Sequence, residues 1–105
     1  MQIELYKKAR STLAAFAEEH GLVMEVHERS PHDMGKHWTE SIRYYARFKG
    51  CEVKSGNVLI GMYGNGCTPE SAMKVYAQEI SERRLVIDAM TEFRREIDVP
   101  LLVQE

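Results

Sequence analysis

One short stretch of the sequence alternates between apolar and polar side chains more regularly than any other, and it constrains the fold most. Residues 42 to 49 carry apolar side chains at every second position, with basic or aromatic side chains between them. This period of two is typical of a β-strand that buries one face. The apolar set is Ile42, Tyr44, Ala46 and Phe48, and the other set is Arg43, Tyr45, Arg47 and Lys49. A strand of this kind needs a covering layer, and we expect helices to supply it.

The N-terminal part of the chain is predicted to supply one such helix. Apolar side chains recur at steps of three and four residues from Ile3 to His20, and Gly21 follows where helices commonly end. Alternation over residues 22 to 27 then predicts a strand. Residues 30 to 41 contain proline and glycine and show no periodicity, so they are predicted to form a loop.

The second helix has the most strongly marked start in the chain. Thr68 can cap it, Pro69 fits the first helical position, and Glu70 favours the positive end of the helix dipole. The apolar stripe extends to about residue 81. Before this helix, residues 58 to 63 are predicted to form a strand that pairs back on the strand at 42 to 48.

The C-terminal residues are predicted to form a β-hairpin. Residues 85 to 90 and 96 to 102 have the composition of short strands, joined by residues 91 to 95. Pro100 indicates that the last strand lies at an edge, where it could pair with its copy in a homodimer. The predicted fold is therefore α+β, with the order α-β-β-β-α followed by a C-terminal β-hairpin.

Length and composition limit the classes of protein that the chain can belong to. The 105 residues fit one domain, 44% of them are hydrophobic and 29% charged, which is the usual balance for a folded chain. Fourteen basic residues against sixteen acidic ones give a net charge of -2, so no overall positive field attracts nucleic acid or anionic membrane. No apolar stretch approaches the roughly 20 residues needed to span a bilayer, and the start of the chain lacks a signal-peptide pattern. We expect a cytoplasmic protein.

Residues of about 3 to 81 resemble the double-stranded RNA-binding domain. In that family a Gly-x-Gly turn precedes a helix whose first turn carries lysines, and Gly64-Asn65-Gly66-Cys67-Thr68 occupies the same place here. The resemblance implies that this helix grips phosphates across the RNA major groove, while the loop between the first two strands enters the minor groove. The sequence departs from the pattern at Pro69, Glu70 and Ser71, and only Lys74 is basic in this region. Most of the phosphate clamp is therefore absent.

Residues of about 42 to 102 also resemble small, mostly uncharacterised phage and prophage proteins. The resemblance rests on the Gly64-Asn65-Gly66-x-Thr68-Pro69-Glu70-x-Ala72 motif and on Arg95-Glu96-Ile97-x-Val99-Pro100. It implies a mobile element of a bacterium as the genomic context. Small phage proteins of this kind include inhibitors of host defence such as anti-CRISPR proteins.

Three features could carry chemistry, and each has a simpler structural explanation. His27, His32, Asp33 and His37 offer ligands for zinc or nickel, but their spacing matches no established site, and they could be ordinary surface residues. Cys67 precedes a helix, where a thiol can become reactive, or it is only a small residue at a turn. The turn at residues 64 to 66 could hold an anion, or its glycines could serve a positive φ.

The most informative candidate site is the polar face of the strand at 42 to 49. Arg43, Tyr45, Arg47 and Lys49 are expected to form a row on an open sheet face, where they could stack on bases or meet an acidic protein surface. The alternative is a solvated face that keeps the protein soluble. We add His37 and Trp38 of the long loop as partner-binding residues, because Trp38 is the only tryptophan and could anchor a partner or fill the core.

These observations favour a binding protein over an enzyme. The sequence shows no nucleophile with an evident base, no metal-ligand motif and no nucleotide-binding loop, so we expect neither catalysis nor a cofactor. The leading hypothesis is a phage-encoded protein-interaction module that binds a bacterial host protein or complex, such as an inhibitor of a defence system. The alternative is a nucleic-acid binder of the double-stranded RNA-binding type.

Overall fold

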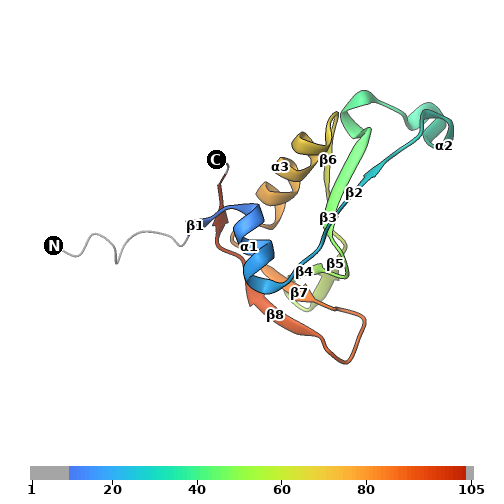
Figure 1. Cartoon of the computed structure of the whole chain (residues 1–105). Coiled ribbons are helices and arrows are strands. Elements are labelled where there is room, and N and C mark those ends of the chain that lie inside the picture. Colours follow the sequence, from blue (N-terminus) through green and yellow to red (C-terminus); the bar gives the residue numbers. More distant parts are fainter. Residues whose placement is uncertain (1–9, 104–105) are drawn as a thin grey trace.

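The computed structural model describes residues 10–103 and shows a mixed α+β fold with two antiparallel sheets (Figure 1). Its elements, in chain order, are β1 (Arg10–Ser11), α1 (Leu13–His20), β2 (Met24–Glu28), α2 (Pro31–Met34), η2 (Gly35–His37), η3 (Glu40–Ile42), β3 (Tyr44–Phe48), β4 (Glu52–Ser55), β5 (Val58–Ile60), β6 (Gly64–Gly66), α3 (Pro69–Ile80), β7 (Arg84–Ile87), β8 (Arg95–Asp98) and β9 (Leu101–Leu102). None of the helices in the described part is long and apolar enough to cross a membrane.

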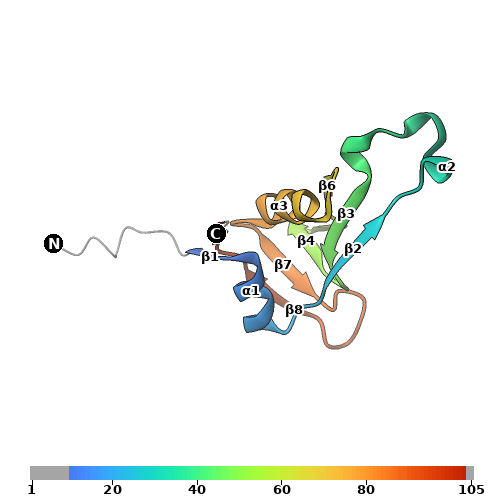
Figure 2. The same cartoon turned by 45° about the horizontal axis from the view of Figure 1, so that its top comes forward.

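The first sheet has the strand order β2-β3-β6, with both pairs antiparallel. Its central strand is β3, in which Ala46 stands opposite Val26 on one side and Gly64 on the other. In both views the β2–β3 arm extends away from α1 and carries α2 at its far end (Figures 1 and 2). The predicted loop at 30 to 41 therefore lies at one end of this sheet, and it contains short helical turns.

Helix α3 packs directly on β6 because two glycines allow a very close approach. A Cβ atom on Gly64 would overlap the backbone of Ala72 and Tyr76, and one on Gly66 would overlap Ser71 and the backbone of Ala72. Neither glycine has a positive φ. The predicted tight turn at 64 to 66 is therefore wrong, because these residues form an extended strand whose glycines serve contact with the helix.

The second sheet has the strand order β5-β4-β7-β8, again antiparallel throughout. Its inner face, the first sheet and both long helices meet in one core. Fully buried aromatic side chains form its centre, with ring centroids 6.2 Å apart for Phe16 and Phe48, and 5.4 Å apart for Phe48 and Tyr76. Ile80 of α3 and Leu85 of β7 are buried beside them.

Several predicted elements are confirmed. Helix α3 begins after Thr68, whose hydroxyl accepts from the Ser71 N–H at 3.1 Å while the Ser71 hydroxyl accepts from the Thr68 N–H at 3.0 Å. The C-terminal hairpin also forms, because β7 pairs with β8, but its second strand ends at Asp98 and residues 101 to 102 form β9, which pairs with β1. The hairpin extends the second sheet beside β4, rather than the sheet that contains β3.

Other predictions are corrected by the structure. The helix expected from residue 3 to residue 20 begins only at Leu13, after the Thr12 cap, and β1 immediately before it pairs in parallel with β9. Residues 3 to 9 of that prediction lie outside the described part. The strand predicted at 58 to 63 does not pair with β3, because β5 pairs with β4 instead and β6 takes the place beside β3. The predicted three-stranded meander is thus interrupted by the β4–β5 hairpin.

Candidate functional site

The first sheet has one face covered by helices and one open face. Met24 and Val26 of β2 stand opposite Phe48 and Ala46 of β3, and all four pack in or against the core. Because side chains alternate along a strand, the residues between them project from the opposite face. His27 stands opposite Tyr45, and Glu25 stands opposite Arg47. The structure therefore places Tyr45 and Arg47 on the open face, as the alternation in the sequence predicted.

An aromatic cluster lies at the centre of the open face. The Tyr45 ring stacks on His27 with 5.0 Å between centroids and meets the edge of Tyr63 at 5.8 Å. The Arg29 guanidinium lies 4.4 Å from the Tyr45 ring centroid and 5.5 Å from that of Tyr63. A cation so close to two ring faces is attracted by both quadrupoles. We call His27, Arg29, Tyr45, Arg47 and Tyr63 the open-face cluster.

Arg29 fixes the geometry of this cluster. Its Nη1 donates hydrogen bonds of 2.7 Å to the carbonyl oxygen of Ile42 and to Oδ1 of Asn65. The side chain therefore links the end of β2 to the residues before β3 and to the middle of β6. Sequence reasoning missed Arg29 and Tyr63, whose proximity depends on packing between distant segments. The alternation along β2 could have placed His27 on this face.

A hollow of about 490 Å³ lies beside the cluster, between the open face and the loop that follows β2. It is lined by residues of the strands and of the loop, namely Glu28, Arg29, Ser30, Asp33, Met34, Tyr45, Arg47 and Tyr63. Arg47 donates from Nη2 to the carbonyl oxygen of Cys51 at 3.1 Å, but its buried Nε has no hydrogen-bond partner within the described residues. The hollow thus combines aromatic rings with charges of both signs.

Arg43 and Lys49, which we expected in the same row, lie just beyond the two ends of β3. Arg43 precedes β3 and caps η3, and its guanidinium forms ion pairs with Glu28 at 2.9 Å and Glu40 at 3.4 Å. The hydrogen bond to Glu28 is the main cause that raises the pKa of Arg43. Lys49 follows β3 and is exposed, with its backbone N–H bonded to the Val23 carbonyl at 2.9 Å. The backbone bonds from the Arg29 N–H to the Arg43 carbonyl and from the Lys49 N–H to the Val23 carbonyl continue the β2–β3 register, so Arg43 and Lys49 stand at the two ends of the row that contains Tyr45 and Arg47.

The two predicted loop residues do not line the hollow. His37 ends η2 and is exposed, and Trp38 follows it in an extended conformation and is half-buried. The loop contributes Ser30, Asp33 and Met34 to the hollow instead. His37 and Trp38 therefore belong to the neighbouring loop surface, separate from the open-face cluster.

The histidines proposed as metal ligands do not converge. Within residues 10–103 no three His, Cys, Asp or Glu side chains are placed to hold a metal ion together. His27 stacks on Tyr45, while His32 and His37 lie exposed on α2 and η2. The carboxylate of Asp33 lines the hollow, and none of the three histidines lines it as well.

The cysteines differ in environment. Cys67 is exposed and is free of any disulfide. Cys51 is also a free thiol but is buried, and burial raises its pKa to about 11. A thiol with such a pKa stays protonated at neutral pH and is a poor nucleophile. Cys51 is therefore a core side chain, whereas Cys67, the thiol considered for reactivity, is the exposed one.

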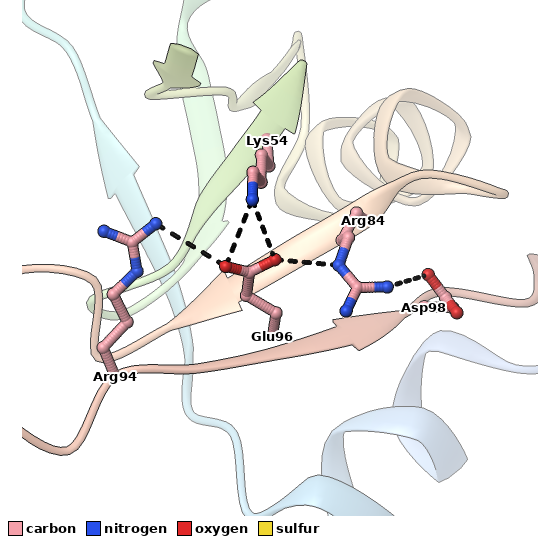
Figure 3. Close-up of polar contacts among 5 residues, drawn as sticks. All are labelled: Lys54, Arg84, Arg94, Glu96 and Asp98. Carbon is pink, nitrogen blue, oxygen red and sulfur yellow. Dashed lines mark hydrogen bonds and ion pairs between the residues drawn. The ribbon is translucent and has the colours of Figure 1, made fainter. Parts of the chain in front are cut away.

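The outer face of the second sheet is a contrasting charged surface. Glu96 accepts hydrogen bonds from Lys54 at 3.3 Å and from Arg84 at 2.8 Å, and Arg94 lies 3.7 Å away (Figure 3). Arg84 also binds Asp98 at 2.9 Å. The pKa of Glu96 is lowered, and the hydrogen bond from Arg84 is the largest cause. These five side chains pair with one another, whereas Oε2 of Glu52 on the same face is buried and has no hydrogen-bond partner among the described residues.

Comparisons with known proteins give no relative from which a function could be transferred. No protein-family model matches the chain, and searches of curated proteins and of solved structures find no significant match.

Proposed function

We propose that this protein is a non-enzymatic binding module that contacts a protein partner through the open-face cluster and the adjoining loop. The observation that carries the proposal is the pair of tyrosines held around Arg29 at the mouth of the hollow. Tyrosine and arginine are the residues that most often dominate the binding energy of protein interfaces. Their arrangement here is fixed before binding, which lowers the entropy lost when a partner docks.

The exposure of the cluster supports this proposal. The Tyr63 side chain is 44% exposed although its ring packs against Tyr45 and Arg29. Half-exposed aromatic residues beside a concave surface can bury further area against a partner.

The charge around the hollow favours a protein over a nucleic acid. Two arginines, Arg29 and Arg47, and two carboxylates, Glu28 and Asp33, line it together. Nucleic acid affinity rests on the neutralisation of phosphates by basic groups, and carboxylates beside the site oppose it. Mixed charges with aromatic residues suit a protein surface better.

The partner class is proposed from the sequence resemblance to small phage proteins. On that basis a protein or complex of a bacterial host, including a defence complex, is the first target to examine. The proposed inhibitor role rests on this resemblance, whereas the geometry of the cluster supports binding to a protein partner of any class.

The experiment that tests the proposal is a comparative pull-down from bacterial lysate after nuclease treatment. Wild-type protein is compared with Tyr63→Ala, and Phe93→Ala is the matched control because Phe93 is an aromatic residue that is 73% exposed outside the cluster. We expect a stoichiometric partner whose affinity falls about 30-fold in Tyr63→Ala, a typical loss for a central interface residue. Equal capture by wild type and Tyr63→Ala would contradict the proposal.

The alternative function, binding of double-stranded RNA, rests on one observation of the structure. Helix α3 does begin beside a strand of a three-stranded antiparallel sheet, where the double-stranded RNA-binding domain holds its phosphate clamp. The first turn carries Pro69, Glu70 and Ser71 in place of lysines. Fluorescence anisotropy with a labelled RNA duplex tests this alternative. Binding that weakens steeply with added salt would favour it, and no binding at low salt would reject it.

A further inference from the structure

The two edges of the second sheet differ sharply in side-chain character. The edge strand β8 has the sequence Arg-Glu-Ile-Asp, and its Arg95 side chain donates to the His20 carbonyl oxygen of α1 at 2.7 Å. The opposite edge strand, β5, has the sequence Val-Leu-Ile. No charged residue occurs from Gly56 to Gly61. Proteins usually protect exposed strand edges with charges, proline or covering segments, and β5 shows none of these within the described residues.

The backbone of β5 offers hydrogen-bonding groups on its free side. β4 and β5 are joined by a two-residue turn, so the flanking pair Ser55 and Val58 exchanges both backbone hydrogen bonds. The next pair, Lys54 and Leu59, is then a pair without such bonds. The N–H and C=O groups of Leu59 therefore point away from β4. Within residues 10–103, β5 pairs with no other strand.

The side chains of β5 are unusually exposed for their type. Val58 is 63% exposed and Ile60 is 39% exposed, and both project from the same side of the strand. Val58 stands opposite Ser55, and Ile60 stands opposite Val53, which is a core residue. Val58 and Ile60 therefore lie on the core-facing side of the sheet, at its edge. An apolar strand that also has free backbone groups is the combination that favours pairing with another strand.

We propose that β5 pairs with β5 of a second copy of this chain, antiparallel and across a two-fold axis. The axis would pass between the two Leu59 residues, which would exchange two backbone hydrogen bonds. Val58 of each copy would then stand opposite Ile60 of the other, so apolar side chains meet apolar side chains twice. A second copy suits this edge because an isologous contact places like residues together, and an uncharged strand suffers no repulsion from its own copy.

The small size of the edge sets the strength of this dimer. A strand of three residues buries much less than the roughly 1,200 Å² typical of stable interfaces. We therefore expect a concentration-dependent dimer, formed at tens to hundreds of micromolar, rather than a permanent one. The inference does not depend on the proposed function, because β5 lies in the other sheet. It also replaces the expectation of dimerisation through the C-terminal strand, whose hairpin presents the charged edge.

Sedimentation velocity of the full chain at about 5 µM to 500 µM tests the dimer. Wild type should shift from monomer to dimer over this range, and Val58→Lys should stay monomeric because it places two ammonium groups on the shared edge. Val23→Lys is the matched control, since Val23 is the same residue type and is 60% exposed away from β5. A wild-type chain that stays monomeric, or equal dimerisation of wild type, Val58→Lys and Val23→Lys, would overturn the proposal.

Cysteine cross-linking identifies which edge is used. In a Cys67→Ser background, Leu59→Cys should form a disulfide-linked dimer under mild oxidation, because directly opposed residues have Cα atoms about 5.5 Å apart, within disulfide range. Asp98→Cys on the β8 edge is the control, and its side chain is 84% exposed. Cross-linking of Asp98→Cys without cross-linking of Leu59→Cys would assign the contact to the opposite edge and reject β5.

Discussion

The exposed faces of the two sheets differ in the arrangement of their charged side chains. On the second sheet, Glu96 is bound by Lys54 and Arg84, and Arg84 is bound in turn by Asp98. On the first sheet, tyrosine rings surround Arg29, and a buried Arg47 nitrogen has no partner among residues 10–103. A surface whose charges are paired among themselves gains little from a new ligand. A face whose clustered aromatic rings are still partly exposed can gain more, which is why we assign binding to the first sheet.

The two sheets also differ in how closely their glycines pack against neighbouring elements. The first sheet depends on direct contact between β6 and α3 at Gly64 and Gly66. In the second sheet, Gly56 lies at the turn between β4 and β5, and a Cβ atom there would meet nothing within 4 Å. The two sheets should therefore respond very differently to the same substitution.

The largest effect is expected for Gly64→Ala. The new methyl group would overlap the backbone of α3, which cannot move without separating β6 from the helix. We expect the free energy of unfolding to fall by more than about 3 kcal/mol, measured by urea denaturation followed by circular dichroism. Gly56→Ala is the control, and the positive φ of Gly56 should cost about 1 kcal/mol. Similar losses in the two variants would show that the close approach is not essential.

The elements that could be predicted from the sequence are those marked by local chemistry. The start of α3 was predicted correctly because Thr68 and Pro69 act on neighbouring backbone groups. The alternation in β3 also predicted which side chains share a face, since Ala46 and Phe48 are buried while Tyr45 and Arg47 project from the other side. Both signals are contained in a few consecutive residues.

The missed features depend on contacts between distant residues. The sequence predicted a strand at residues 58 to 63 but could not show that its partner is β4 rather than β3. Gly64 and Gly66 were interpreted as a turn, because glycine is equally suited to a turn and to close packing against a helix. The role of Arg29 depends on Asn65, which lies 36 residues further along the chain. The site could therefore be predicted only as a face, without its central arginine.

An intermediate effect is expected from alkaline pH, which tests the core shared by the two sheets. Burial raises the pKa of Cys51 from 9.0 to about 11 and that of Tyr76 from 10.0 to about 12. Above pH 9 the unfolded Cys51 thiol releases its proton while the folded one keeps it, so the free energy of unfolding should fall. For one titrating group, the free energy of unfolding can fall by at most about 1.4 kcal/mol per pH unit. Urea denaturation at pH 8, 9 and 10 measures this slope.

Cys51→Ala is the control for the alkaline slope. The variant is less stable at all pH values because it leaves a small cavity, but its loss between pH 9 and pH 10 should be smaller than in wild type. The effect of Tyr76 should remain, since its unfolded side chain titrates from about pH 10. An unchanged slope in Cys51→Ala would mean that other groups cause the loss.

The smallest effect is expected for Glu96→Gln, which tests whether the second sheet's charged surface acts only within the molecule. Arg84 and Lys54 lower the pKa of Glu96, so its contribution is present at neutral pH and is lost as the pH falls through that lowered value. We expect a small loss of stability at pH 7 that shrinks in 1 M salt, as for other surface ion pairs. Glu79→Gln is the control, because Glu79 is exposed on α3 and has no ion pair with any described residue.

Since the network pairs its charges internally, partner binding should be the same in Glu96→Gln and in wild type. If binding instead weakened as strongly as in Tyr63→Ala, the second surface would have to belong to the interface, and the contrast between the two sheets would no longer locate the binding site.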